Sequence, residues 1–270
     1  MEEVFFITLC VGLGLASGFI GGLLGIGGGV VIVPALALSY DFGGRFPPEQ
    51  SLLVAVATSL ACIIFTSASA AYTQYRAGKV RWDLFRKLVA FLLLGSFLAG
   101  FIAPALPVEI FRGFIGLFLA FVAIVMLSSW QPHPHRQFPN VLGAAGIGTA
   151  GGIAAGLAGI AGGNVIVPTL VYFNTPIHNA TATSSALGVP IALTATCGYL
   201  LAAPVLMNGP LFGYVDISAF FPIVAGALIA APMGVKFAHR VPAPKLKKVF
   251  GVLLIFVSAR MLYTVFGLGA

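Results

Sequence analysis

Residues 18–36 read GFIGGLLGIGGGVVIVPAL, and residues 152–170 read GIAAGLAGIAGGNVIVPTL. At this offset of 134 positions, 12 of the 19 residues are identical, and Pro34 coincides with Pro168. A glycine-rich composition alone would not also reproduce the Val-Ile-Val-Pro sequence that follows each run. The two stretches therefore indicate an internal repeat, in which one structural unit occurs twice along the chain.

Two further matches extend the repeat. Ala57-Thr58-Ser59 corresponds to Ala182-Thr183-Ser184 at an offset of 125, and Gly116 corresponds more weakly to Gly251 at an offset of 135. The changes in offset fit a longer loop after the first quoted stretch and a longer loop late in the second half. The repeat therefore covers most of the chain.

The composition is that of a membrane protein. Of the 270 residues, 59% are hydrophobic and only 8% are charged, and the mean hydropathy is +1.06. Soluble domains carry about 25% charged residues, so the composition excludes a soluble globular enzyme, a disordered chain and a nucleic-acid-binding domain. The net charge of +7 then reflects loops that face the cytoplasm.

Ten apolar segments lie between charged residues, prolines and glycines. Eight of them approach the ~20 residues that a bilayer-spanning helix needs, whereas 28–40 and 162–173 are short. Partly extended backbone before the prolines would let the short segments cross as well. We predict an all-α polytopic membrane protein with two five-segment repeats, 1–130 and 140–270, joined by a linker at 131–139. The eight longer segments are 4–24, 51–75, 84–104, 109–130, 140–158, 180–202, 214–235 and 246–266.

Basic residues are distributed unequally between equivalent loops of the two repeats. Regions 76–87 and 236–248 each contain five Lys or Arg. The loop equivalent to 76–87 contains no Lys or Arg, and the turn equivalent to 236–248 is followed only by Arg112. A concentration of Lys and Arg in only one of two equivalent loops is typical of inverted repeats, whose equivalent loops lie on opposite sides of the membrane. If all ten segments cross, 11 of the 14 basic residues lie on one side, but re-entrant short segments would divide them almost evenly. We therefore predict inverted repeats in the cell inner membrane, with both basic regions cytoplasmic and both chain termini outside.

Glycines open both short segments. Gly27, Gly28 and Gly29 stand at the start of the first, and Gly162, Gly163 and Asn164 at the start of the second. Glycine permits a left-handed backbone and close approach, and N–H groups at a helix start favour an anion. Inverted repeats would bring the two starts together near the midplane, where transporters bind substrate. We predict that these six residues bind a small anion, and the alternative is that the glycines only allow close helix packing.

Other polar side chains are further candidates for this site. Thr58-Ser59 and Thr183-Ser184-Ser185 lie early in longer segments, where their hydroxyls could donate to an oxyanion. The alternatives are a bond to the carbonyl four residues back or contact between helices. Arg260 is the one cation well inside a segment, and it either attracts the anion or extends to the membrane surface.

The acidic residues avoid the middle of every segment. Cation pumps and proton relays usually need carboxylates inside the membrane, so this distribution favours an anionic substrate. The cysteines and histidines are scattered without metal-ligand or catalytic spacing, and we predict no enzyme activity, no metal and no cofactor. The seven acidic residues are Glu2, Glu3, Asp41, Glu49, Asp83, Glu109 and Asp216.

The duplicated glycine run with its β-branched residues and proline resembles the sulfite exporter TauE/SafE family of membrane permeases. The resemblance rests on 18–36 and 152–170, with support from the Ala-Thr-Ser matches and the turn at 78–83, and it covers nearly the whole chain. It implies movement of sulfite, sulfoacetate or related organosulfonates across the cytoplasmic membrane.

We therefore predict a secondary transporter for a small sulfur-containing anion that works by alternating access. The expected partners are this anion and membrane lipids, with no nucleic acid, and a homo-oligomer stays open. An anion channel and a non-transporting membrane assembly factor are the alternatives.

Overall fold

The computed structural model contains an almost entirely helical chain. It describes residues 2–24, 27–128, 139–203, 211–237 and 243–265. These residues form ten α-helices and one antiparallel hairpin of two short strands, and each predicted segment corresponds to one helix with ends that differ by at most three residues. The elements are α1 (Glu2–Leu24), α2 (Gly29–Gly43), α3 (Pro48–Arg76), α4 (Trp82–Ala105), α5 (Val108–Leu127), α6 (Val141–Ala158), α7 (Gly163–Tyr172), α8 (Ile177–Ala202), β1 (Leu211–Phe212), β2 (Val215–Asp216), α9 (Ile217–Phe237) and α10 (Ala243–Val265).

Seven of the described helices are long and apolar enough to span a bilayer. Helices α2 and α7 have only 15 and 10 residues. Both are helical through the residues around Pro34 and Pro168, so the partly extended backbone considered for these segments is wrong. Within the predicted linker and the second basic region, residues 131–138 and 238–242 lie outside the described residues.

Local signals in the sequence set where several helices begin. Helices α3, α5 and α8 start directly after Pro47, Pro107 and Pro176. Proline has a φ suited to a helix and lacks an N–H, so it is tolerated where the first N–H groups have no intrahelical partner. Helix α6 starts after Asn140, whose side chain accepts the N–H of Gly143 at 3.1 Å.

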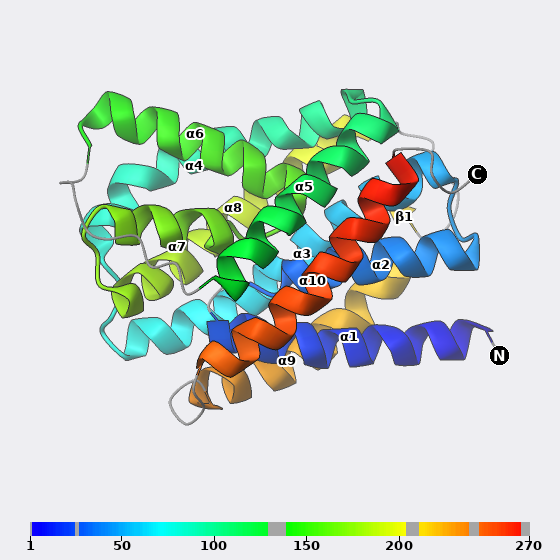
Figure 1. Ribbon diagram of the computed structural model, residues 1–270, viewed down its shortest axis with the longest axis horizontal. Coiled ribbons are helices and arrows are strands. Elements are labelled where there is room, and N and C mark those ends of the chain that lie inside the picture. The colour runs from blue at the N-terminus through cyan, green and yellow to red at the C-terminus, as the bar shows by residue number, and fades with distance from the viewer. Residues whose placement is uncertain (1, 25–26, 129–138, 204–210, 238–242, 266–270) are drawn as a thin grey trace.

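Most helices run along one axis of the molecule (Figure 1). Helix α1 begins and α10 ends at one end, which also carries the β1–β2 hairpin and the turn between α2 and α3. We call this the hairpin end. The turn between α3 and α4 lies at the other end, which we call the basic end because it carries the predicted basic region 76–87.

The long helices pack in pairs that join the two halves of the chain. Helix α1 packs along α9, α6 along α4, α3 along α8 and α5 along α10. A side chain at Gly14, Gly18 or Gly22 of α1 would overlap the backbone of α9, and one at Gly95 or Gly152 would overlap the facing backbone between α4 and α6. Small residues allow this close packing in membranes. The halves are therefore interlocked.

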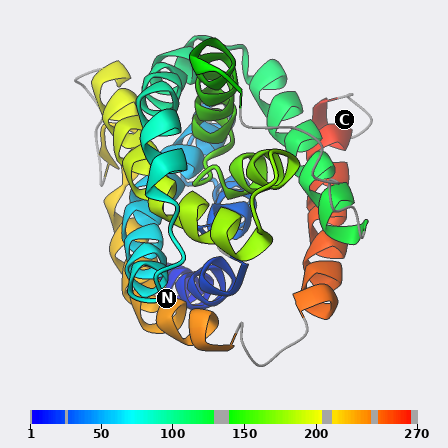
Figure 2. The same cartoon turned by 90° about the vertical axis from the view of Figure 1, so that its left-hand side faces the viewer.

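The short helices lie toward the centre of the bundle, with longer helices around them (Figure 2). Gly29 and Gly163, their first residues, are buried. At 1.5 Å per residue, α2 and α7 extend only about 22 and 15 Å, so both helices begin inside the protein.

Candidate functional site

Glycines in left-handed backbone interrupt the chain before both short helices. Gly27 and Gly28 have a φ of 77°, and Gly159 and Gly162 have φ values of 67° and 74°. A residue with a Cβ is strained in this region. We call 27–28 the first break and 159–162 the second break. No side chain caps the N–H groups at the start of α2 or α7, and such groups favour an anion.

The two breaks lie against each other. A Cβ added to Gly27 would overlap the Cβ of Ala161, and one added to Gly29 would overlap the carbonyl of Gly159. The protein backbone therefore approaches itself closely where the two short helices start. The structure brings the predicted glycines of both halves into one region.

Two hydroxyls of α3 hold the breaks in place. Ser59 donates to the carbonyl of Gly159 at 2.9 Å, and Thr66 donates to the carbonyl of Gly27 at 3.0 Å. All of these groups are buried. The predicted residue Ser59 is thus bonded to the second break.

Thr58 and Thr183, at equivalent repeat positions, make equivalent contacts. Thr58 Oγ1 accepts the N–H of Asp216 at 2.9 Å, and Thr183 Oγ1 accepts the N–H of Arg81 at 3.0 Å. Thr183 also donates to the carbonyl of Asn179 at 2.7 Å. Each threonine therefore fixes the chain just before a helix of the other half.

Three buried polar atoms, on α3, α7 and α8, have no hydrogen-bond partner among the described residues. They are Nδ2 of Asn164 and the hydroxyl oxygens of Ser67 and Ser184. Ser67 faces Gly27 and Gly188. Because an unpaired buried donor costs free energy, these atoms mark places where a ligand with acceptor oxygens would be stabilised.

Sequence reasoning missed Ser67. At the offset of 125 its repeat counterpart is Ala192, so matching the two halves gives no signal for it. A signal exists in the spacing, because Ser59, Ile63 and Ser67 recur every four residues and share one face of a helix.

Two other predicted residues have contacts of their own. Ser185 donates to the carbonyl of Thr181 at 3.0 Å, which is the bond within a helix considered as an alternative. Arg260 of α10 stacks over the ring of Phe42 at 4.4 Å. Phe42 lies at the end of α2 farthest from Gly29, so the structure does not bring Arg260 to the breaks.

Asp216 lies at a segment end, as predicted, but its side chain is fully buried. The hairpin places it against α2 and α3, where it accepts the hydroxyl of Tyr40 at 3.0 Å and lies 3.6 Å from Arg45. No local pattern in the sequence indicated this cluster. At the basic end, the Asp83 carboxylate bonds the guanidinium of Arg81 and raises the pKa of Arg81.

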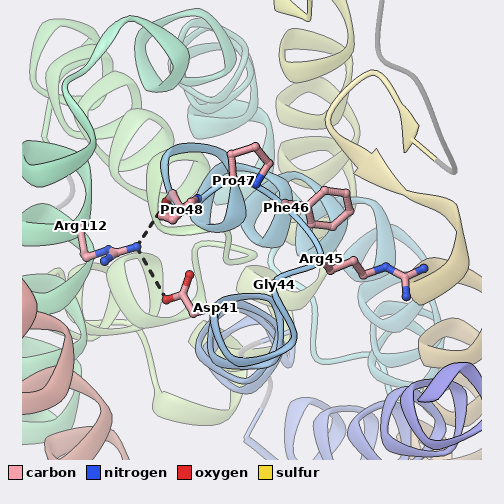
Figure 3. A pocket seen from close by; sticks show the side chains of 7 residues that line it. All are labelled: Asp41, Gly44, Arg45, Phe46, Pro47, Pro48 and Arg112. Atoms are coloured by element: carbon pink, nitrogen blue, oxygen red, sulfur yellow. Dashed lines mark hydrogen bonds and ion pairs between the residues drawn. The ribbon is translucent and has the colours of Figure 1, made fainter. Parts of the chain in front are cut away.

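An open cavity of about 530 Å³ lies at the hairpin end (Figure 3). Arg112 extends across it to the carbonyl of Pro48 at 3.4 Å and to the carboxylate of Asp41 at 3.7 Å. Arg45 also lines the cavity, but its guanidinium points away from Arg112. The other residues that line the cavity are Gly44, Phe46 and Pro47.

Residues 10–261 match the model of the sulfite exporter TauE/SafE family. The chain belongs to this family. The chain is similar over nearly its whole length to a probable membrane transporter protein of Haemophilus influenzae, with 30% identity over 95% of this chain and 98% of the relative. It is also similar to the probable membrane transporter protein YunE of Bacillus subtilis, with 26% identity over 96% of this chain and 97% of the relative. Another occurs in Methanocaldococcus jannaschii, with 26% identity over 95% of this chain and 97% of the relative. TauE/SafE proteins are membrane transporters and not enzymes, so this multi-pass protein is a transporter.

Proposed function

We propose that this transporter moves a small sulfur-containing anion, such as sulfite or an organosulfonate, by alternating access, and that the anion binds beside the two breaks, where α2 and α7 start. The observation that carries the proposal is a set of three buried donors, on Asn164, Ser67 and Ser184, that find no hydrogen-bond partner in the described part of the chain. N–H and O–H donors beside uncapped helix starts suit the oxygens of an oxyanion. The family description as a sulfite exporter supports a sulfur oxyanion.

The moving units in this proposal are the halves 1–130 and 140–270, acting as inverted repeats. Reciprocal packing supports it, since the first helix of each half lies along the fourth helix of the other half. The equivalent bonds made by Thr58 and Thr183 support it as well. Because the halves are interlocked, rocking one repeat against the other requires the paired helices to tilt or slide along each other, which would expose the breaks to each end in turn.

We propose ten membrane segments, in which α2 and α7 each return the chain from a break inside the protein to the membrane surface, with the basic end in the cytoplasm and both chain termini outside. The number of basic residues at each end supports this orientation. Region 76–87 at the basic end contains five, whereas the basic residues that line the cavity at the hairpin end are Arg45 and Arg112. A reporter fused after Ala270 should behave as periplasmic. Cytoplasmic behaviour of that reporter would contradict the orientation.

Transport should be measured with purified protein in liposomes. We expect sulfite uptake that saturates with concentration, compared with sulfate, thiosulfate, sulfoacetate and taurine in the same assay. A channel would instead give flux that rises linearly with driving force. Absence of flux for every anion would favour an assembly role.

Removal of an unpaired hydroxyl tests the site. Ser67→Ala deletes a donor that has no partner to lose, so the protein should fold normally while sulfite flux falls about tenfold, as expected for one hydrogen bond to a charged ligand. Thr8→Ala is the control, since this exposed hydroxyl bonds only the Val4 carbonyl of its own helix. Flux that is equal in both variants would contradict the site.

A further inference from the structure

A fully buried carboxylate lies at the hairpin end. Asp216 Oδ2 accepts the hydroxyl of Tyr40 at 3.0 Å and lies 3.6 Å from Nε of Arg45. Its other oxygen accepts the N–H of Ser218 at 2.9 Å, at the start of α9. The Asp216 side chain is 0% exposed. A carboxylate removed from water in this way depends on such partners.

This cluster joins the two halves of the chain. Tyr40 lies on α2 and Arg45 on the turn that follows, whereas Asp216 belongs to the second half. Arg45 also stacks over the ring of Phe6 on α1 at 4.3 Å, and Thr58 of α3 accepts the N–H of Asp216. If the halves rock apart at the hairpin end, the contact between Arg45 and Asp216 must separate.

The contact between Arg45 and Asp216 is weak enough to separate. Arg45 Nε has no hydrogen-bond partner among the described residues, and 3.6 Å is too long for a hydrogen bond. The Arg45 side chain is 26% exposed and borders the open cavity of Figure 3. A pair with one partner in contact with water is held less tightly than a fully buried, hydrogen-bonded pair.

The basic end is built differently. Arg81 occupies the repeat position of Asp216, because the N–H of each is accepted by an equivalent threonine. The guanidinium of Arg81, however, pairs with Asp83 only two residues away, and both side chains are about half exposed (46% and 51%). This ion pair therefore does not join the halves.

A second open cavity lies at the basic end, between α3, α4 and α8. Its volume is about 400 Å³, and its lining is almost entirely apolar. It includes Ala71, one helical turn beyond Ser67 on α3, and Val189, next to Gly188 on α8. The Asp216 cluster lies at the opposite end of the molecule, at the hairpin end (Figure 1).

We propose that Arg45 and Asp216 form the gate pair of the hairpin end, whose contact closes the transport pathway on that side and whose separation opens it. The inference rests on the proposed alternating-access function. On separation, Arg45 becomes a free cation at the mouth of the pathway, where it attracts an anion. The buried surface around the cluster becomes accessible to water at the same time.

Two native cysteines report on this opening. Cys10 and Cys62 are fully buried. They lie one helical turn beyond Phe6 and Thr58, which contact Arg45 and Asp216. In the Cys197→Ser protein, which lacks the exposed thiol, the small membrane-impermeant reagent trimethylammonium-ethyl methanethiosulfonate is applied to either face of sealed vesicles. Asp216→Asn keeps the oxygen that accepts from Ser218, and we expect it to speed modification from the hairpin face about tenfold or more. Arg45→Gln should have the same effect.

Two variants serve as controls, one that keeps the charge at position 45 and one that removes the same charge at another position of the cavity. Arg45→Lys keeps the cation and should stay close to the unchanged protein, and Arg112→Gln removes a cation of the same cavity that pairs with Asp41 instead. Unchanged modification in Asp216→Asn and Arg45→Gln would overturn the gate, as would equal acceleration from both faces, which indicates general loosening. Because labelling needs no substrate, failure of the transport proposal appears separately, as absent flux in the unchanged protein.

Discussion

The first and second breaks have similar backbones but different polar groups. Gly28 and Gly162 both adopt left-handed backbone directly before a helix. The second break is followed by Asn164, with an unpaired amide, whereas the first is followed by the buried Val30. The two halves therefore reproduce the backbone geometry that interrupts a helix, while the donors near the breaks are not symmetric.

The serines show the same asymmetry. Ser59 bonds the carbonyl of Gly159, whereas Ser184, its repeat counterpart, has no partner among the described residues. Ser67 is also unpaired, and its counterpart is Ala192. This distribution suits one anion held unequally by the two halves better than two anions at equivalent sites.

The largest expected effect comes from a side chain at the first break. Gly28→Val forces a β-branched residue into left-handed backbone and against the carbonyl of Ser17, so we expect destabilisation of more than about 3 kcal/mol and loss of sulfite flux. Gly162→Val meets only the flexible ends of Ile166 and Ile191 and should cost less, about 1–3 kcal/mol.

Thermal unfolding in detergent and liposome flux measure these two effects. Gly12→Ala is the control, because nothing lies within 4 Å of an added Cβ there. Equal destabilisation by the Gly28 and Gly162 variants would show that the breaks tolerate side chains alike, contrary to the packing around them.

The next effect separates binding from folding. Asn164→Val gives the second break the residue that follows the first, so it removes a buried amide nitrogen that has no partner among the described residues. Stability should stay equal or rise by about 1 kcal/mol, while sulfite flux falls about tenfold. The reciprocal change Val30→Asn buries an amide at a fully buried position and should lower the melting temperature. A destabilised Asn164→Val protein with normal flux would reverse this assignment.

The smallest effects distinguish the paired serine from the unpaired one. Ser59→Ala loses the bond to Gly159 and should cost about 1 kcal/mol. Ser184→Ala loses no bond and should change stability by less than about 0.5 kcal/mol, yet it should reduce flux more than Ser59→Ala does. The comparison needs melting temperatures and initial sulfite uptake rates for both proteins, and the same order in both measurements would contradict it.

The sequence was sufficient for features that depend on local pattern. Hydrophobic length predicted each helix, and the duplicated glycines predicted both breaks because left-handed backbone before a helix has a strong residue preference. It was not sufficient for contacts between distant residues. Asp216 is at a segment end by its position, and only the packing of the hairpin against Tyr40 makes it buried. Whether Ser59 or Ser184 keeps a free hydroxyl likewise depends on a carbonyl of the other half.

The pairing of α1 with α9 also bears on biosynthesis. The glycine face of α1 packs against residues around Ile223 and Ala227, roughly two hundred positions later in the chain, and synthesis proceeds from the N-terminus. Helix α1 therefore enters the bilayer long before its partner exists, with Gly14 and Gly18 facing lipid. During that interval the small-residue face of α1 is available to other membrane helices, so correct assembly depends on the late arrival of α9.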